Sequence, residues 1–226
     1  MSLTLTEGAN TVFVSDGSVL DLNAADGVIT YSGPVGLFSI NVTTALSKPG
    51  LGGPAVAHTD LNSINSSNQN ATLVITMIDV FQLVTQPGLH MVESAIGGTT
   101  QGTLTAHQII DTSFVLREPP TPYQLADLTA PFELDLSHGP FSGAPPTPGG
   151  PGLAAFADLK MGSIFLPGTP FLLAEQVEIV HPASIPGVAT SFDFSSRVFV
   201  PEPASVLFWL GVFGIGMVAH WWRRRK

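Results

Sequence analysis

The sequence predicts an all-β protein: an antiparallel β-sandwich, with the jelly roll as one form that it can take, followed by a single C-terminal transmembrane helix. Three observations support this prediction. Short segments alternate between apolar and polar residues, which is the period of a half-buried strand. Glycine and proline are frequent, at 23 and 19 of 226 residues, and many of them separate those segments. The chain ends in a long uncharged apolar run.

About 200 residues precede this tail, which is enough for one all-β domain with a sizeable core. We therefore expect one domain over residues 1–200 and a separate tail over residues 201–226. About ten short strands are expected in the domain. The segments that read as strands are residues 11–14, 18–22, 27–31, 35–43, 71–81, 111–116, 171–180 and 191–200.

Some of these segments support more specific predictions. Residues 11–14 and 18–22 flank a turn signal and should form a hairpin or a meander. Residues 71–81 are rich in β-branched side chains, which suits a central strand. In the last segment, Phe192, Phe194 and Val198 alternate with Asp193, Ser195 and Arg197. We expect residues 171–180 to be the antiparallel neighbour of this segment.

Three stretches are predicted to be irregular. Residues 60–70 are crowded with asparagine, serine and glutamine, which favours a polar loop. Gly97-Gly98 reads as a turn before the strand at 111–116. Residues 118–152 hold nine of the 19 prolines and should form an exposed Pro/Gly-rich loop, either at one end of the sandwich or between its sheets.

Charge is distributed unevenly. The tail holds four of the eight basic residues and only Glu202 of the 17 acidic ones, which leaves the rest of the chain with four basic and sixteen acidic residues. A strongly acidic domain argues against nucleic acid and anionic membrane surfaces as partners. There is no cysteine, so the core alone must stabilise the fold.

The tail has the composition of one membrane crossing. Residues 204–222 carry no formal charge, and a helix of that length spans roughly 29 Å, close to the hydrocarbon thickness of a bilayer. A basic cluster follows at once, and it should stay in the cytoplasm and place the domain on the other side of the membrane. The cluster consists of Arg223, Arg224, Arg225 and Lys226.

The tail also carries a specific motif. Val200-Pro201-Glu202-Pro203, one hydrophobic span and a terminal basic cluster together resemble the PEP-CTERM sorting signal of Gram-negative bacteria. The resemblance implies export, an inner-membrane-anchored precursor, processing near the Pro-Glu-Pro by an exosortase, and a mature form at the cell surface or outside the cell. A plain single-span anchor is the alternative, with prolines that merely end the preceding strand.

The first seven residues lack the basic region and the apolar region of a secretory signal peptide. Because a sorting tail requires export, either a signal peptide is encoded upstream of Met1 or export follows another route, and we favour the first hypothesis.

Motifs for chemistry are largely missing. The histidines show no metal-ligand spacing and there is no nucleophile elbow or phosphate-binding loop, so no catalytic residue and no cofactor are assigned. Calcium is the one candidate metal, since Asp16, Asp21 and Asp26, with Asn23, could supply oxygen ligands. The histidines are at positions 58, 90, 107, 138, 181 and 220.

These observations favour a non-enzymatic exported protein of the cell surface or extracellular matrix, associated with exopolysaccharide or biofilm, with exosortase and the membrane as partners. The alternative is a carbohydrate-binding ectodomain, in which Tyr31, Tyr123 or phenylalanines would line a sugar-binding face. A secreted hydrolase is the third hypothesis, and it predicts clustered carboxylates or a Ser–His pair in one site.

Overall fold

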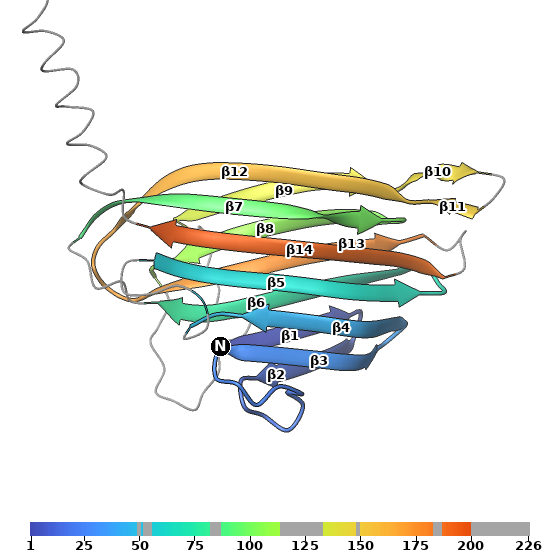
Figure 1. The fold of residues 1–226 in the computed structure, drawn as a ribbon, viewed down its shortest axis with the longest axis horizontal. Helices are drawn as coiled ribbons and strands as arrows, with labels where there is room; N and C mark the ends of the chain where they lie inside the picture. The colour runs from blue at the N-terminus through green and yellow to red at the C-terminus, as the bar shows by residue number, and fades with distance from the viewer. Residues whose placement is uncertain are drawn as a thin grey trace, which may run out of the picture.

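A computed structural model describes residues 1–48, 51, 56–81, 87–113, 133–147, 150–182 and 187–199. Two six-stranded antiparallel sheets pack face to face as a β-sandwich, and a short two-stranded hairpin extends from one end (Figure 1). The all-β, antiparallel prediction is therefore confirmed. The span predicted at 204–222 and the motif at 200–203 lie outside the described residues. Within the described part, no helix is both long enough and apolar enough to cross a membrane.

We name the sheets A and B. Sheet A contains, in spatial order, β2 (Asn10–Ser15), β1 (Ser2–Glu7), β6 (Ala71–Phe81), β13 (Phe171–His181), β8 (Thr103–Asp111) and β9 (Leu134–Ser142). Sheet B contains β12 (Ala154–Leu166), β7 (Gly88–Thr100), β14 (Val188–Phe199), β5 (Val56–Ser67), β4 (Phe38–Leu46) and β3 (Val28–Val35). The hairpin consists of β10 (Ala144–Thr147) and β11 (Gly150–Gly152).

Eight of these strands are paired in a nested order. Along the chain, β5 pairs with β14, β6 with β13, β7 with β12 and β8 with β9, so the first strand pairs with the last and the middle two with each other. Successive strands alternate between the two sheets except at the β8–β9 hairpin. This winding is that of a jelly roll. Strands β1–β4 extend the two sheets on one side.

The core lies between the sheets and falls into two main clusters. The larger one gathers apolar side chains of β1, β3, β4, β6 and their neighbours, including the fully buried Phe194. The smaller one, which includes Phe171, Leu173 and Val198, lies at the other end of the sandwich. Each such phenylalanine contributes roughly 1.5–3 kcal/mol through removal of its surface from water. The phenylalanines expected in the core are mostly found there, but Phe165 is 64% exposed.

Residues 60–70, predicted to be a loop, are largely strand, because β5 runs to Ser67. The prediction failed because four of the six inward-facing side chains of β5 are polar and hide the alternation. Thr59, Ser63 and Asn65 are all buried. Most of their polar groups find partners inside, as when Thr43 Oγ1 and Ser63 Oγ share a hydrogen bond of 2.8 Å, whereas Asn65 Oδ1 has no hydrogen-bond partner among the described residues. A core tolerates a hydroxyl group that makes a hydrogen bond, so a polar sequence can form a buried strand as well as a loop.

The Pro/Gly-rich segment at 118–152 is also more regular than predicted. Strand β9 and the β10–β11 hairpin occupy most of its second half. Proline is compatible with β9 because this strand is at the edge of sheet A, where one row of N–H groups has no partner among the described strands. Residues 118–132 lie outside the described part of the chain.

Gly97-Gly98 is part of β7 and not a turn, and the next strand, β8, ends at Asp111 where the predicted one began. Packing explains Gly98 but not Gly97. A Cβ atom at Gly98 would lie 2.1 Å from the carbonyl oxygen of Ser191 on the neighbouring strand, whereas one at Gly97 would have its nearest neighbour at 3.6 Å. Gly98 therefore permits a close backbone approach within the sheet.

Two pairing predictions are wrong. Strand β2 forms its hairpin with β1, and residues 18–22 form turns instead of a strand. Strands β13 and β14 were expected to be neighbours but lie in different sheets, because the chain crosses the sandwich between them. Period-two patterning identifies the buried face of a strand but not its partner. The strands predicted at 71–81, 171–180 and 191–200 are confirmed, and β6 is central in its sheet.

Candidate functional site

The three aspartates predicted to bind calcium lie in the segment before β3. Asp21 Oδ1 accepts hydrogen bonds from the backbone N–H groups of Asn23 and Thr30, both at 2.9 Å, and Oδ2 accepts one from Gly17 at 3.1 Å. Asp16 Oδ2 accepts one from the Gly27 N–H at 2.8 Å. Two of the carboxylates therefore hold the turns of this segment in place.

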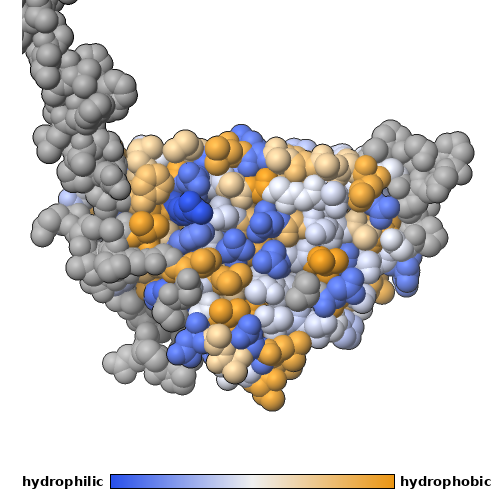
Figure 2. All heavy atoms as spheres, in the orientation of Figure 1, coloured by the Kyte–Doolittle hydropathy of each residue, from blue (hydrophilic) through white to orange (hydrophobic). Residues whose placement is uncertain are grey.

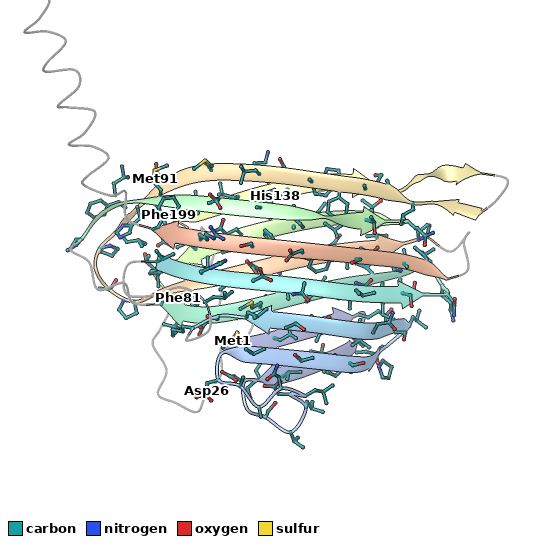
Figure 3. All side chains as sticks on the ribbon, viewed as in Figure 1. Met1, Asp26, Phe81, Met91, His138 and Phe199 are labelled. Carbon is teal, nitrogen blue, oxygen red and sulfur yellow. The ribbon has the colours of Figure 1, made fainter. Side chains whose placement is uncertain are left out.

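Asp26 is exposed at the surface of the same segment (Figure 3). No group of three or more histidine, aspartate or glutamate side chains within the described ranges is placed to hold a metal ion. The geometry thus assigns Asp16 and Asp21 to turn formation, and it brings no third acidic ligand to them.

Tyr31 does not supply a sugar platform either. Tyr31 is buried, and its hydroxyl donates a hydrogen bond of 3.0 Å to the carbonyl oxygen of Pro34. Tyr123 lies outside the described residues. An aromatic residue that stacks on a sugar has to present its face to solvent, and Tyr31 does not.

Charged side chains gather instead on the outer face of sheet B. Strands β5 and β14 are hydrogen-bonded neighbours at the centre of this sheet, and each turns every second residue outward. Strand β7 adds one more charged residue beside β14. We call this group the polar face, and it appears as blue patches across the middle of the sheet in Figure 2. It consists of His58, Asp60, Asn62, Glu93, Asp193, Ser195 and Arg197.

One end of the polar face is organised around His58. Its Nε2 atom lies 3.0 Å from Ser195 Oγ and 3.4 Å from Arg197 Nε. Because Arg197 can only donate, Nε2 is the accepting nitrogen and the ring proton is on Nδ1. Burial lowers the pKa of His58, and the positive charge of Arg197 lowers it further. His58 is therefore neutral at pH 7. Arg197 Nη1 also lies 3.9 Å from Glu93 Oε1.

Two carboxyl groups meet in the middle of the polar face. Burial and the neighbouring carboxylate of Asp193 raise the pKa of Asp60 to about 6, while a hydrogen bond from Asn62 acts in the opposite direction. Below that pH, Asp60 holds a proton that it can share with Asp193. At pH 7 Asp60 is largely ionised, and its carboxylate serves as a hydrogen-bond acceptor.

Small residues border this charged stripe. Ala95 and Gly97 of β7 lie beside Ser195 and Asp193 on one side, and beside Leu159 and Ala157 of β12 on the other. Because alanine and glycine carry a methyl group at most, few side-chain atoms rise above the backbone between the charged residues of β14 and the apolar residues of β12. The polar face thus offers acceptors and donors next to a flat, weakly apolar strip.

A buried polar layer lies directly beneath this face. Glu175 of sheet A is fully buried and accepts a hydrogen bond of 3.0 Å from Thr59 Oγ1 of sheet B. Burial raises the pKa of Glu175 well above its usual range, and the charges of Asp60 and Asp193 add to the effect. The Ser196 hydroxyl is close enough to favour the charged form. However, neither Ser196 Oγ nor Glu175 Oε2 makes a hydrogen bond of good geometry.

The same layer reaches the sandwich edge through His138 of β9, whose position is marked in Figure 3. His138 Nε2 lies 2.8 Å from Ser94 Oγ, and Nδ1 lies 3.0 Å from Asp158 Oδ2 of β12. Lys160 Nζ is 3.5 Å from the same carboxylate. Burial lowers the pKa of His138, although Asp158 opposes this shift. These contacts join the edge strands of the two sheets.

The arrangement is suited to binding more than to covalent catalysis. Transfer of the Ser195 proton to His58 would create an imidazolium beside Arg197, which is unfavourable. Ser195 lies in mid-strand between two paired neighbours, so adjacent backbone N–H groups are committed to the sheet and do not form an oxyanion hole.

Sequence patterning had placed Asp193, Ser195 and Arg197 on one face, and this is confirmed. It missed the β5 residues and the buried Glu175. Both faces of β5 carry polar side chains, so its sequence holds no period-two signal that would have identified them.

No family model matches the chain, and no curated protein is detectably similar to it in sequence. Solved structures that resemble it include TmCBM61 in complex with beta-1,4-galactotriose, at 8% identity over 73% of this chain and 90% of that chain, with a TM-score of 0.27. A cleaved K3 adhesin domain of Lys-gingipain from Porphyromonas gingivalis matches at 9% identity over 61% and 72% of the two chains, with a TM-score of 0.29. Carbohydrate-binding modules from the β-sandwich superfamily match at 12% identity over 88% and 70%, with a TM-score of 0.19. Similarity at this level assigns neither a ligand nor an activity to this chain.

Proposed function

We propose that the chain is a non-enzymatic exported protein of the cell surface or extracellular matrix, and that its sandwich binds carbohydrate through the polar face. The observation that carries the binding proposal is the stripe of acceptors and donors at the centre of sheet B beside a flat strip of small residues. Vicinal hydroxyl groups of a sugar can both donate to carboxylates and accept from Arg197, while C–H faces can rest on the small residues.

Charge narrows the class of carbohydrate. Asp60, Asp193 and Glu93 outnumber Arg197 on this face, and the chain outside the tail is strongly acidic. A polyanionic polysaccharide would be repelled by this field, particularly at low salt. The preferred ligand is therefore a neutral polysaccharide.

The binding test uses immobilised neutral and uronic-acid-containing polysaccharides and four forms of the protein. Wild type should be retained by at least one neutral polysaccharide. Asp193→Ala and Arg197→Ala should each weaken retention about tenfold or more, since a hydrogen bond to a charged group contributes about 1.5–3 kcal/mol. Glu178→Ala is the matched control, because Glu178 is exposed on β13 in the other sheet.

Binding should also depend on pH. Affinity should change with an apparent pKa near 6 as Asp60 ionises, and Asp60→Asn should remove that dependence. Equal retention of the face variants and wild type, or retention only of acidic polysaccharides, would count against the polar face. Release of reducing sugars that depends on Ser195 or Asp193 would refute the non-enzymatic part.

Sorting is proposed separately, on the strength of the motif at Pro201, Glu202 and Pro203, the apolar run and the terminal basic residues. In cells with the exosortase, the mature chain should be recovered at the surface or in the medium without residues 223–226. In cells without it, the intact chain should stay in the inner-membrane fraction. C-terminal mass mapping of both fractions distinguishes these forms. A mature chain that keeps its arginines in both strains would refute exosortase processing.

A further inference from the structure

Strand β12 forms one edge of sheet B. It pairs with β7 alone, in an unbroken antiparallel register from Ala154 opposite Thr100 to Leu166 opposite Gly88. Its other side presents backbone N–H and C=O groups that none of the described strands pairs with. At 13 residues without a bulge or a proline, this is a long and regular sheet edge. Such an edge is a template for another strand.

The side chains of this edge are unusually apolar for an exposed surface. Leu159, Met161 and Phe165 are 58%, 57% and 64% exposed. Leu153, just before the strand, and Leu89, opposite Phe165 on β7, are exposed to a similar degree. Figure 2 shows hydrophobic residues along the upper rim of the molecule, where β12 runs. An apolar row of this kind on a sheet edge indicates an interaction surface.

We propose that the edge pairs with the same strand of a second copy, antiparallel and about a two-fold axis at Leu159. Leu159 then faces Leu159 of the second copy, and Leu153 faces Phe165 of the second copy. Asp158 faces Lys160 of the second copy, and the two-fold axis repeats this ion pair on its other side. Opposite charges and apolar groups directly across an antiparallel pair are both stabilising. The two copies of sheet B become one continuous sheet.

The two charges also select this register. With the axis at Asp158 or at Lys160, two like charges would face each other. With the axis at Ala157 or Met161, both charges would face uncharged residues and gain no partner in the second copy. Only the axis at Leu159 gives each charge an opposite one among these neighbouring registers. Two isologous surfaces related in this way close into a dimer.

A two-fold axis perpendicular to the sheet keeps both polar faces on the same side of the dimer. A polymer lying across the continuous sheet could then contact both faces, which raises the effective affinity without a new contact. The pairing itself does not depend on what the polar face binds.

The chain has no cysteine, so the register can be tested by single cysteines in the full-length protein in mild detergent. Directly opposed residues have Cα atoms about 4.5–5.5 Å apart, within the range of a disulfide. Leu159→Cys should therefore form a covalent dimer quickly on mild oxidation. Ala157→Cys or Met161→Cys alone should not, because each lies about 13 Å or more from its own copy. A mixture of those two variants should form the mixed dimer.

Val19→Cys, in a loop and 97% exposed, reports random collisions. Light scattering of wild type should give the mass of two chains. Lys160→Asp leaves the contact between Asp158 and His138 in place and should lower the dimer fraction at least tenfold, because like charges then face each other across the axis. Lys160→Arg keeps the charge and should keep the dimer. A monomer or a larger assembly, crosslinking of Met161→Cys with itself, or Leu159→Cys crosslinking no faster than Val19→Cys would each overturn the proposal.

Discussion

His181 gives the sandwich a predictable loss of stability in acid. Its ring is completely buried between the sheets, with Nδ1 at 3.0 Å from Ser67 Oγ and Nε2 at 2.9 Å from Thr190 Oγ1. The ring also packs against Phe38, with 4.8 Å between ring centres. Burial lowers the pKa of His181 from 6.5 to about 4. The folded protein therefore holds this ring neutral where the unfolded chain would protonate it.

The size of the effect follows from that shift. For a depressed histidine pKa, the contribution to stability is fully present above pH 6.5 and is lost as the pH falls toward 4. The interval is about 2.5 pH units, and at about 1.4 kcal/mol per unit the loss is about 3 kcal/mol. Urea unfolding followed by far-ultraviolet circular dichroism at several pH values measures it. Tryptophan fluorescence is unsuitable because all three tryptophans lie in the tail.

His181→Gln isolates this contribution. At pH 7.5 the variant should be less stable than wild type by about 2 kcal/mol, since it loses the ring packing and a hydrogen bond. Because wild type loses about 3 kcal/mol through this ring by pH 4, the difference should close near pH 5 and reverse by about 1 kcal/mol at pH 4. His107→Gln is the control, because His107 is exposed beside Asp135. Burial also lowers the pKa of His58 and His138, so only the difference between curves is diagnostic. A gap that stays constant from pH 7.5 to 4 would refute the reasoning.

Three further outcomes are expected. Glu175→Gln should have the same stability as wild type near pH 4 and be the more stable form at higher pH, because the stability that a raised carboxyl pKa contributes is present below about pH 4.5 and is lost as the pH rises. Urea denaturation at pH 4 and pH 8 tests this, and a variant that is less stable than wild type at both pH values would contradict it. Gly98→Ala should destabilise by about 2 kcal/mol or more through its clash with Ser191, while Gly97→Ala should be nearly neutral; equal melting temperatures would contradict the packing argument. Calcium added to the chelated protein should leave its Tm unchanged, because Asp16 and Asp21 already accept backbone hydrogen bonds. A rise in Tm would instead support the calcium site predicted from the sequence.

Sequence patterning predicted the class of fold because most inward positions are apolar. In β14, Phe192, Phe194 and Val198 are buried and their neighbours face outward, as the period of two requires. It could not predict which strands pair. The partner of β14 is set by how the chain crosses between sheets, and neighbours in sequence such as β13 need not be neighbours in space.

The candidate site was harder to predict for a related reason. Its β5 residues lie in a strand whose inner face is itself polar, so residues 60–70 read as a loop. Thr59 is buried because Glu175, more than a hundred residues away, accepts its hydrogen bond. A polar core position of this kind is stable only when its distant partner is in place, and no local pattern contains that partner.

Strands β5 and β14 contribute side chains to both surfaces of sheet B, so they connect the polar face on the outside to the polar layer beneath it. Thr59 and Ser196 point inward toward Glu175, while their chain neighbours Asp60 and Arg197 point outward. The carboxylates of Asp60 and Asp193 oppose ionisation of Glu175, and by the reciprocity of linked titrations a charged Glu175 would oppose theirs. The burial that keeps Glu175 protonated therefore leaves Asp60 free to ionise near pH 6. A neutral residue at position 175 is compatible with a charged polar face, which is why Glu175→Gln should stabilise the sandwich without weakening retention on polysaccharide.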